Sequence, residues 1–223
     1  MLLRTFPVHL NQKAMPLKDI VNKVKKELDV VQKNDAKDKH FVQENQYPDI
    51  ASAQIAFGKA KEKLFDVNKW TDLPGISSTF ELYNPAGDKI ETPAPQVGDF
   101  VRIKLPGIPV DNWVQVTDIQ SEDLSAQFTV KPSPEPNPAP DSAEEVKHFF
   151  GKEASSTFKV ELDGTTLRGE EIGRDEMPNN ETEEAGGRAL LNTLVAEGGW
   201  AGFQKLQWDK LTAYLVHKVE TTS

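Results

Sequence analysis

Hydrophobic positions along this 223-residue chain recur with a helical period towards both ends and with a strand period in the middle. Apolar residues spaced three and four apart line one side of a helix, and those spaced two apart line one side of a strand. The helical spacing predicts helices at 17–33, 50–66, 183–197 and 200–219. Residues 34–49 are polar and lysine-rich, and they predict a loop between the first two helices.

The alternating positions predict an antiparallel sheet of about six strands. The last two predicted strands flank Asp163-Gly164, a pair that is typical of a tight type I′ hairpin turn. Alternating prolines from Pro132 to Pro140 favour an extended connector over a paired strand. The predicted strands are 79–83 with 89–90 across a tight turn, then 97–105, 113–119, 126–131, 156–162 and 165–172.

The order of these elements predicts the fold class. Strands that are grouped between helices, and do not alternate with them, are typical of α+β proteins. We therefore expect N-terminal helices, the antiparallel sheet, and C-terminal helices packed on that sheet. No internal repeat or long linker divides the sequence, which predicts one domain over 1–223, helical at 1–69, mainly β at 70–182 and helical at 183–219.

Charge is unevenly distributed along the chain, whose net charge is −9. Residues 1–69 contain 13 Lys/Arg and 9 Asp/Glu, whereas residues 70–223 contain 13 and 26. An acidic main body repels phosphates, which argues against nucleic-acid binding. The lysine-rich residues 13–39 suit an acidic protein partner, but the alternative that they face the acidic body of the same molecule or solvent is favoured.

Composition removes several kinds of chemistry. The absence of cysteine excludes disulfides, thiolate zinc sites and a cysteine nucleophile, and the four histidines form no HExxH motif. Phosphate-binding GxxxxGK[ST] and nucleophile GxSxG motifs are absent too, so no cofactor is predicted. No run of about 18 apolar residues predicts a membrane span, and the N-terminus lacks a signal-peptide pattern, so we expect a cytoplasmic protein.

The densest group of polar residues lies at 170–180, after the last predicted strand. Neighbouring carboxylates can do acid–base chemistry when burial or mutual repulsion raises one pKa, and carboxylate and amide oxygens also bind divalent cations. The metal-ligand candidates are Asp175, Glu176 and Asn179. The alternative is an exposed acidic loop in which Arg174 pairs with a nearby carboxylate and the asparagines cap the next helix.

Aromatic residues suggest a second site. If the C-terminal helix lies across a curved sheet, its aromatic side chains face those of the strands and can close an apolar pocket. The alternative is that the same residues fill an ordinary core. The candidate ligand-binding residues are Trp113, Phe128, Phe158, Arg174, Trp200, Phe203 and Trp208.

Several segments resemble an uncharacterised bacterial family without a known activity. They are KWTDLPG at 69–75, VGD at 97–99, DNWV at 111–114, STF at 156–158, GRDEMPN at 173–179 and GRALLNTLVAEGGWAGFQKLQW at 187–208. The order of elements is also loosely similar to the START-like helix-grip arrangement. That resemblance implies a sheet wrapped around a terminal helix, often with an apolar ligand between them.

Three functional hypotheses follow. The first is a non-catalytic binding protein that holds an apolar small molecule between the sheet and the C-terminal helix. The second is an enzyme that uses the acidic segment at 170–180, with or without a divalent cation. The third is a protein-interaction module that uses the lysine-rich helix.

Overall fold

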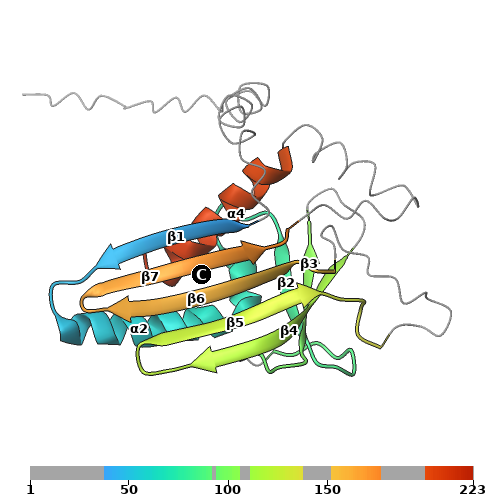
Figure 1. Ribbon diagram of the computed structural model, residues 1–223, viewed down its shortest axis with the longest axis horizontal. Coiled ribbons are helices and arrows are strands. Elements are labelled where there is room, and N and C mark those ends of the chain that lie inside the picture. Colours follow the sequence, from blue (N-terminus) through green and yellow to red (C-terminus); the bar gives the residue numbers. More distant parts are fainter. Residues whose placement is uncertain (1–37, 92–93, 106–110, 138–151, 177–198, 223) are drawn as a thin grey trace, which may run out of the picture. The chain divides into compact units, whose positions relative to one another are not determined.

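The described part of the chain is built on a seven-stranded antiparallel sheet (Figure 1). The computed structural model describes residues 38–91, 94–105, 111–137, 152–176 and 199–222, with the backbone alone for 199–203. All of these residues belong to one compact unit that spans 35–223. The prediction of a single domain over 1–223 stays a prediction for the residues that precede it.

The sheet brings its first and last strands together. Its strands follow the order β1-β7-β6-β5-β4-β3-β2, so the first described strand pairs with the last one. Every neighbouring pair is antiparallel. The strands are β1 (Lys39–Gln46), β2 (Thr79–Tyr83), β3 (Phe100–Lys104), β4 (Asn112–Ser121), β5 (Ser125–Pro132), β6 (Ser155–Asp163) and β7 (Thr166–Arg174).

Helix α2 (Ile50–Phe65) follows β1 after a three-residue connection. Its first turn is capped by Asp49, whose carboxylate accepts a hydrogen bond from the Ser52 backbone N–H at 2.7 Å. A short 3₁₀ helix, η1 (Val67–Asp72), then leads into β2. The buried side of α2 carries residues at helical spacing, namely Ala53, Ala56, Phe57, Ala60 and Leu64, as the sequence predicted.

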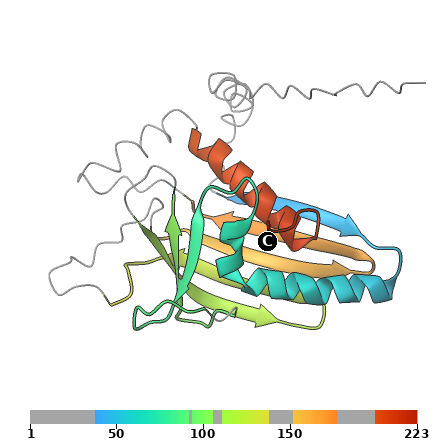
Figure 2. The same ribbon diagram turned by 180° about the vertical axis from the view of Figure 1, so that it is seen from behind.

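Helix α4 (Gly199–Leu215) lies with α2 on one face of the sheet (Figure 2). It packs against β1, β7 and α2. The arrangement is α+β with a C-terminal helix held against a curved antiparallel sheet, which confirms the predicted fold class. It also has the helix-grip form that the looser of the two sequence resemblances implied.

The core between sheet and helices contains a cluster of aromatic rings. Trp70 and Phe128 are 1% exposed, and their ring centroids lie 5.8 Å apart. Phe158 adds centroid distances of 4.9 Å to Trp70 and 5.4 Å to Trp208. Much of the space between strands and helix is therefore filled by the protein's own side chains.

The main error of the sequence prediction is β1. Residues 34–49 were expected to form a loop, but Lys39–Gln46 pair along their whole length with β7. The strand carries polar residues on both faces, so alternation of polar and apolar positions is hard to see in the sequence. Conversely, the short predicted strand at 89–90 is reduced to one isolated bridge between Tyr83 and Lys89.

Other predictions agree with the structure, differ from it in part or lie outside it. The β6–β7 hairpin forms as predicted, but its two-residue turn is Gly164-Thr165, because Asp163 is already paired with Thr166. Gly164 has a φ of 58° whereas Thr165 has no positive φ, so the turn is not the predicted type I′ turn at Asp163-Gly164. The helices expected at 17–33 and 183–197, and most of the proline-rich segment, lie outside the described residues. Among the residues that are described, no helix is long and apolar enough to cross a membrane.

Candidate functional site

An apolar cavity lies where the middle of α4 faces the strands. Its volume is about 40 Å³. Two neighbouring serines, Ser155 and Ser156 at the start of β6, form its polar edge. The apolar wall is built mainly from Val101, Ile103, Val114, Val130, Phe158 and Trp208.

The size of this cavity limits what fits without rearrangement. An apolar cavity of about 150 Å³ holds benzene, and pockets for drug-sized ligands span about 300–1,000 Å³. A volume of about 40 Å³ accommodates only a few non-hydrogen atoms. The aromatic rings of Phe128 and Phe158, which the sequence analysis placed at this site, occupy much of the remaining space.

Trp208 gives the cavity wall an unsatisfied polar atom. Its ring lies 5.4 Å from that of Phe158 and 6.4 Å from that of Phe80, centroid to centroid. Its indole Nε1 is buried and finds no hydrogen-bond partner among the described residues. Leaving a buried donor unpaired costs about 1–3 kcal/mol, so this N–H is a ready contact for an acceptor that enters the cavity.

Next to the cavity, the inner face of β7 carries a buried carboxyl group. Alternation along the strand places Leu167, Gly169, Glu171 and Gly173 on the face that α4 covers. The register sets Glu171 directly opposite Phe158 of β6, which itself lines the cavity. Glu171 is 0% exposed, and no described residue forms a hydrogen bond with either of its carboxyl oxygens.

The two glycines that flank Glu171 on this face explain how the site is packed. A Cβ on Gly169 would lie 3.0 Å from the Thr212 carbonyl oxygen and 3.1 Å from Leu215, so α4 approaches most closely here. A Cβ on Gly173 would lie 2.5 Å from the carboxyl carbon of Glu176. Gly169 therefore allows α4 to pack closely against the strand, and Gly173 leaves space for the carboxyl group of Glu176.

Glu176 reaches this position because the chain reverses after β7. Asp175 adopts a left-handed backbone conformation with a φ of 49°, and its N–H donates to Asp38 at 3.2 Å. Arg174 also donates to Asp38, at 2.9 Å, which ties the turn to the start of β1. Glu176 then points inward, where it accepts hydrogen bonds from the Ser156 hydroxyl and from Gln204 Nε2, each at 3.0 Å.

Burial perturbs both carboxyl groups in the same direction. Loss of hydration raises the pKa of Glu171 well above its ordinary value, and the neighbouring charge of Glu176 raises it further. The nearby Ser156 hydroxyl and the Lys39 ammonium oppose this rise. Burial likewise raises the pKa of Glu176, against hydrogen bonding by Gln204 and the charge of Lys39. The pair therefore holds a proton more tightly than two exposed glutamates would.

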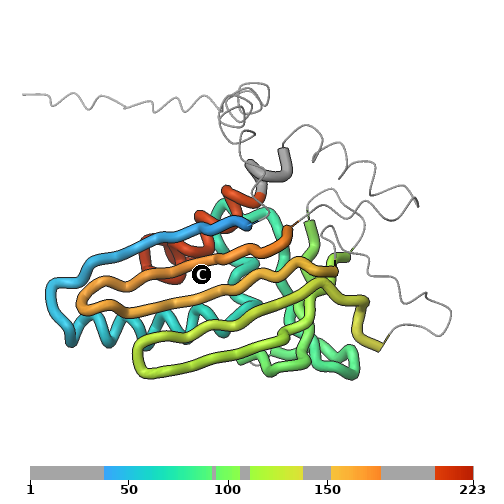
Figure 3. Tube along the Cα trace, in the orientation of Figure 1, coloured from blue at the N-terminus to red at the C-terminus, as the bar shows by residue number. Residues whose placement is uncertain are grey.

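Lys39 supplies the positive charge of this buried cluster. It lies at the start of β1 opposite Gly173, and its ammonium donates to Gln204 Oε1 on α4. Burial lowers the pKa of Lys39, while the charges of Glu176 and Glu171 oppose that change. The start of β1 and the end of β7 lie at the same end of the sheet, as the Cα trace shows (Figure 3). Gln204 of α4 reaches this end, because it contacts both Lys39 and Glu176.

The arrangement combines an apolar cavity with a buried acid–base group. Ser156 belongs to both, because it lines the cavity and donates to Glu176. Two carboxyl groups with raised pKa values beside one ammonium can bind a cation, accept or release a proton, or donate a hydrogen bond when protonated. We call Lys39, Ser156, Glu171, Glu176 and Gln204 the carboxyl cluster.

The structure brings only some of the predicted aromatic site residues together. Phe128, Phe158 and Trp208 line the cavity together. Trp113 does not, because it projects from the other face of β4, where its ring centroid lies 5.0 Å from that of Tyr83. The guanidinium of Arg102 lies over both rings. Trp200 and Phe203 lie on α4, but their side chains are outside the described residues.

The residues predicted in the acidic segment also lie in different environments. Glu176 points inward, whereas Arg174 and Asp175 are exposed and contact Asp38. The local pairing of Arg174 with a carboxylate was the alternative that the sequence left open. Asn179 lies outside the described residues, so its role as a metal ligand stays a prediction. In the described ranges, no three His, Asp or Glu side chains converge as a metal site would require.

Sequence reasoning missed Glu171 and Lys39 as members of the site. The signal for Glu171 was present, because it occupies the same alternating face as Leu167 and both glycines of β7. Lys39 gave no such signal, since its strand was not recognised and it looked like part of a solvated lysine-rich segment.

A second, larger hollow lies on the surface beside η1 and β2. Its volume is about 540 Å³, and its lining includes Asp66, Asn68, Lys69, Asp72 and Lys89. The charges there are matched locally, because Lys69 pairs with Asp72 and Lys89 pairs with Glu81 and Glu91. This shallow polar hollow shows no buried unpaired group at its charged residues, in contrast to the carboxyl cluster.

Comparisons with known proteins extend no further than the general arrangement. No family model and no curated protein sequence matches the chain. Among solved structures, a hypothetical protein of Helicobacter pylori is similar at 15% identity and a TM-score of 0.45, over 79% of this chain and 85% of that one. A major latex-like protein from Panax ginseng is similar at 12% identity and a TM-score of 0.35, over 73% and 93%.

A norcoclaurine synthase from Thalictrum, solved as a point mutant, is also similar at 12% identity and a TM-score of 0.35, over 81% of this chain and 96% of that one. At such identities and scores nothing about function follows. The resemblance to an uncharacterised bacterial family stays a prediction.

Proposed function

We propose that this chain is a binding protein for a small apolar molecule, which it takes up between the sheet and α4. The single observation that carries the proposal is the apolar cavity lined by Trp208, a residue whose buried indole N–H has no hydrogen-bond partner among the described residues. A core that served only for stability would gain by filling this space and by pairing that donor.

The cavity volume sets the size of ligand. A space of about 40 Å³ takes a short hydrocarbon group, and the rest of a longer ligand has to displace a side chain such as Trp208. Trp208 is the natural element to move, because it is only partly buried and belongs to the helix, not to the sheet. Its N–H would then find an acceptor on the ligand or in water.

The test is a titration with butan-1-ol, which combines a four-carbon tail with one neutral hydroxyl group. Methyl NMR signals of Val101, Ile103, Val114 and Val130 should shift in a saturable way, because these side chains line the cavity. Signals of Val116 and Val160, which face the same core but do not line the cavity, should stay in place.

A matched pair of variants locates the binding site. Val114→Ile adds one methyl group at the cavity wall and should weaken butan-1-ol binding several-fold, whereas Val116→Ile on the same strand and face should leave it unchanged. Saturable shifts that survive Val114→Ile unaltered, or an absence of saturable shifts in the unmodified protein, would overturn the proposal.

A further inference from the structure

We propose that the carboxyl cluster recognises a protonated primary amine, so that the ligand of the cavity is a small apolar amine. This inference rests on the proposed function, because it names the polar group of the molecule that the cavity holds. Its evidence is separate, since it comes from Glu171, Glu176 and their neighbours on α4.

The first observation is a set of buried acceptors without donors. Glu171 Oε1 and Oε2 are both buried and form no hydrogen bond with any described residue. The residue is 0% exposed. A primary ammonium group presents N–H donors and no acceptor, so it can donate to both carboxyl oxygens.

The second observation is that Glu171 faces α4 across the interface of sheet and helix. Near one end of that interface, Gln204 of α4 bonds Glu176 beside Gly173. Further along the helix, Thr212 and Leu215 contact Gly169. Glu171 lies between the two glycines on the strand, so it faces the part of α4 between these two contacts.

The third observation is the balance of charge. Two carboxyl groups share one ammonium, that of Lys39, which is occupied by Gln204. A second cation would allow both glutamates to be ionised in a neutral cluster. Without that cation, ionising both glutamates would leave one buried negative charge uncompensated. Lys39, Glu171 and Glu176 are the titratable groups that face this space from β1, β7 and the turn after it.

The fourth observation is continuity with the cavity. Ser156 lines the cavity and donates to Glu176, and Phe158 lines the cavity directly opposite Glu171. A molecule whose carbon chain occupies the apolar wall therefore has the carboxyl cluster next to its polar end. An amine can donate hydrogen bonds to Glu171, whereas a carboxylate would add a third negative charge beside Glu171 and Glu176.

The experiment compares three probes that share a four-carbon tail, namely butylamine, butan-1-ol and butyrate. Isothermal titration calorimetry on the full chain should give the tightest binding for butylamine, at least about tenfold tighter than butan-1-ol, with butyrate weakest. Repeating the butylamine titration in buffers of different ionisation enthalpy should show proton release, because the amine takes the place of the proton that the carboxyl pair holds.

The variants separate the amine from the tail. Glu171→Gln should abolish the preference for butylamine while leaving butan-1-ol binding unchanged, and Glu176→Gln should weaken that preference. Glu170→Gln is the matched control, because this neighbouring glutamate lies on the opposite face with His40 and should not affect any probe.

The outcomes distinguish the two proposals. Equal binding of butylamine and butan-1-ol, or a preference for butylamine that survives Glu171→Gln, would overturn the amine inference and leave the proposed function intact. Failure of all three probes to bind would overturn both.

Discussion

Glu170 and Glu171 are neighbours in the sequence, but their side chains project from opposite faces of β7. Glu170 projects from the outer face of β7, where His40 Nε2 lies 2.6 Å and Lys159 Nζ 4.0 Å from its carboxylate oxygens. Glu171 projects inward, and the described residues offer it no hydrogen-bond partner. Both residues are buried, so one step along the strand separates a buried carboxylate that is paired from one without a partner.

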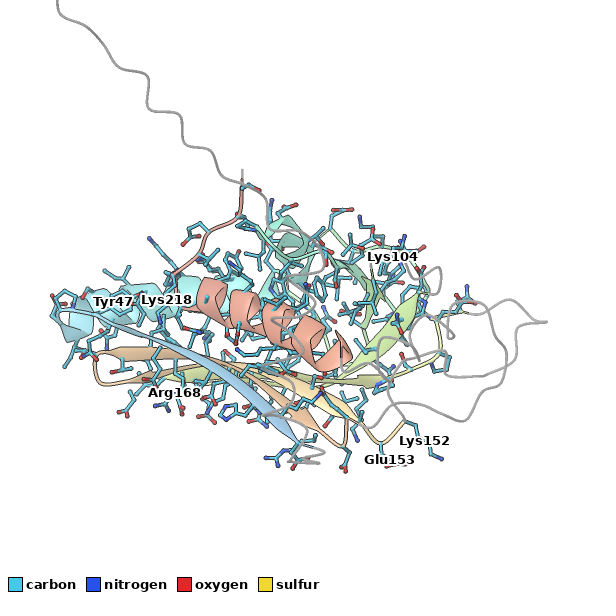
Figure 4. The ribbon with its side chains drawn as sticks, turned by 90° about the horizontal axis from the view of Figure 1, so that it is seen from above. Tyr47, Lys104, Lys152, Glu153, Arg168 and Lys218 are labelled. Atoms are coloured by element: carbon cyan, nitrogen blue, oxygen red, sulfur yellow. The ribbon has the colours of Figure 1, made fainter. Side chains whose placement is uncertain are left out.

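The surroundings of the two residues show the same contrast on a larger scale. The outer face carries a lattice of ion pairs, in which Arg168 contacts Glu44 at 2.8 Å and Lys159 contacts Glu161 at 3.0 Å. Figure 4 shows Arg168 on the side of the sheet away from α4. Such half-exposed pairs contribute little stability and need no ligand. On β7, the carboxyl group without a hydrogen-bond partner among the described residues is that of Glu171 on the inner face, and it is the one that a ligand could pair.

The largest change in the free energy of unfolding is expected at Gly169, where α4 lies against the inner face of the sheet. Gly169→Ala places a methyl group against the Thr212 carbonyl and Leu215, and it should lower the free energy of unfolding by about 1–3 kcal/mol. Gly58→Ala in α2 is the control, because no atom crowds that position, and it should raise stability by up to about 1 kcal/mol. Urea denaturation measures both, and equal effects would show that α4 does not sit on Gly169.

The second-largest change in stability is expected from the ionisation of Glu171. Because its pKa is raised in the folded state, the unfolded state loses its proton first as the pH rises, and stability falls through that range. Glu171→Gln should remove this loss, so that it stabilises the protein by about 1–3 kcal/mol on the alkaline side and by much less on the acidic side. Denaturation between about pH 5 and about pH 8 tests this, and a variant that is less stable throughout would contradict it.

A third change separates the two buried carboxyl groups. Gly173→Ala puts a methyl group where the Glu176 carboxyl lies, so the side chain of Glu176 should swing out to solvent. The pKa of Glu171 should then fall towards its ordinary value, because the neighbouring charge that helps to raise it is gone. A carboxyl-carbon NMR titration of Glu171 in both proteins checks the shift, and an unchanged titration would refute the coupling.

The smallest effect is expected on the outer face. Glu170→Gln removes the ion pair with the half-exposed His40 and the longer contact with Lys159, but it keeps an oxygen that can accept from His40, so it should cost no more than about 1 kcal/mol although Glu170 is buried. Denaturant unfolding at low and high salt measures it, and the cost should shrink as salt screens the pair. A cost larger than the change caused by Glu171→Gln would reverse the contrast between the two faces.

The sequence predicted much of the fold because the apolar period is clear in α2, in the β6–β7 hairpin and in α4. It missed β1, whose inward side chains include Lys39, Gln43 and Asn45, because a strand with polar residues on both faces lacks the usual alternation. The polarity that hid the strand is also what brings Lys39 into the carboxyl cluster.

The candidate site was predicted only in part. Phe128, Phe158 and Trp208 could be chosen as aromatic residues facing a common core, and they do line one cavity. Glu176 was chosen with Asp175 and Arg174, but a left-handed residue sends it inward alone. Such a turn depends on Asp38, which is distant in sequence, and no local pattern reports it.

The most direct test of the buried carboxyl pair as an amine site is a carboxyl-carbon NMR spectrum of Glu171, recorded with and without butylamine at a pH just below its raised pKa. The free protein should show Glu171 protonated, and saturation with butylamine should convert that signal to the ionised form while Glu170 stays unchanged. A Glu171 signal that is ionised from the start, or that does not respond to butylamine, would contradict the account.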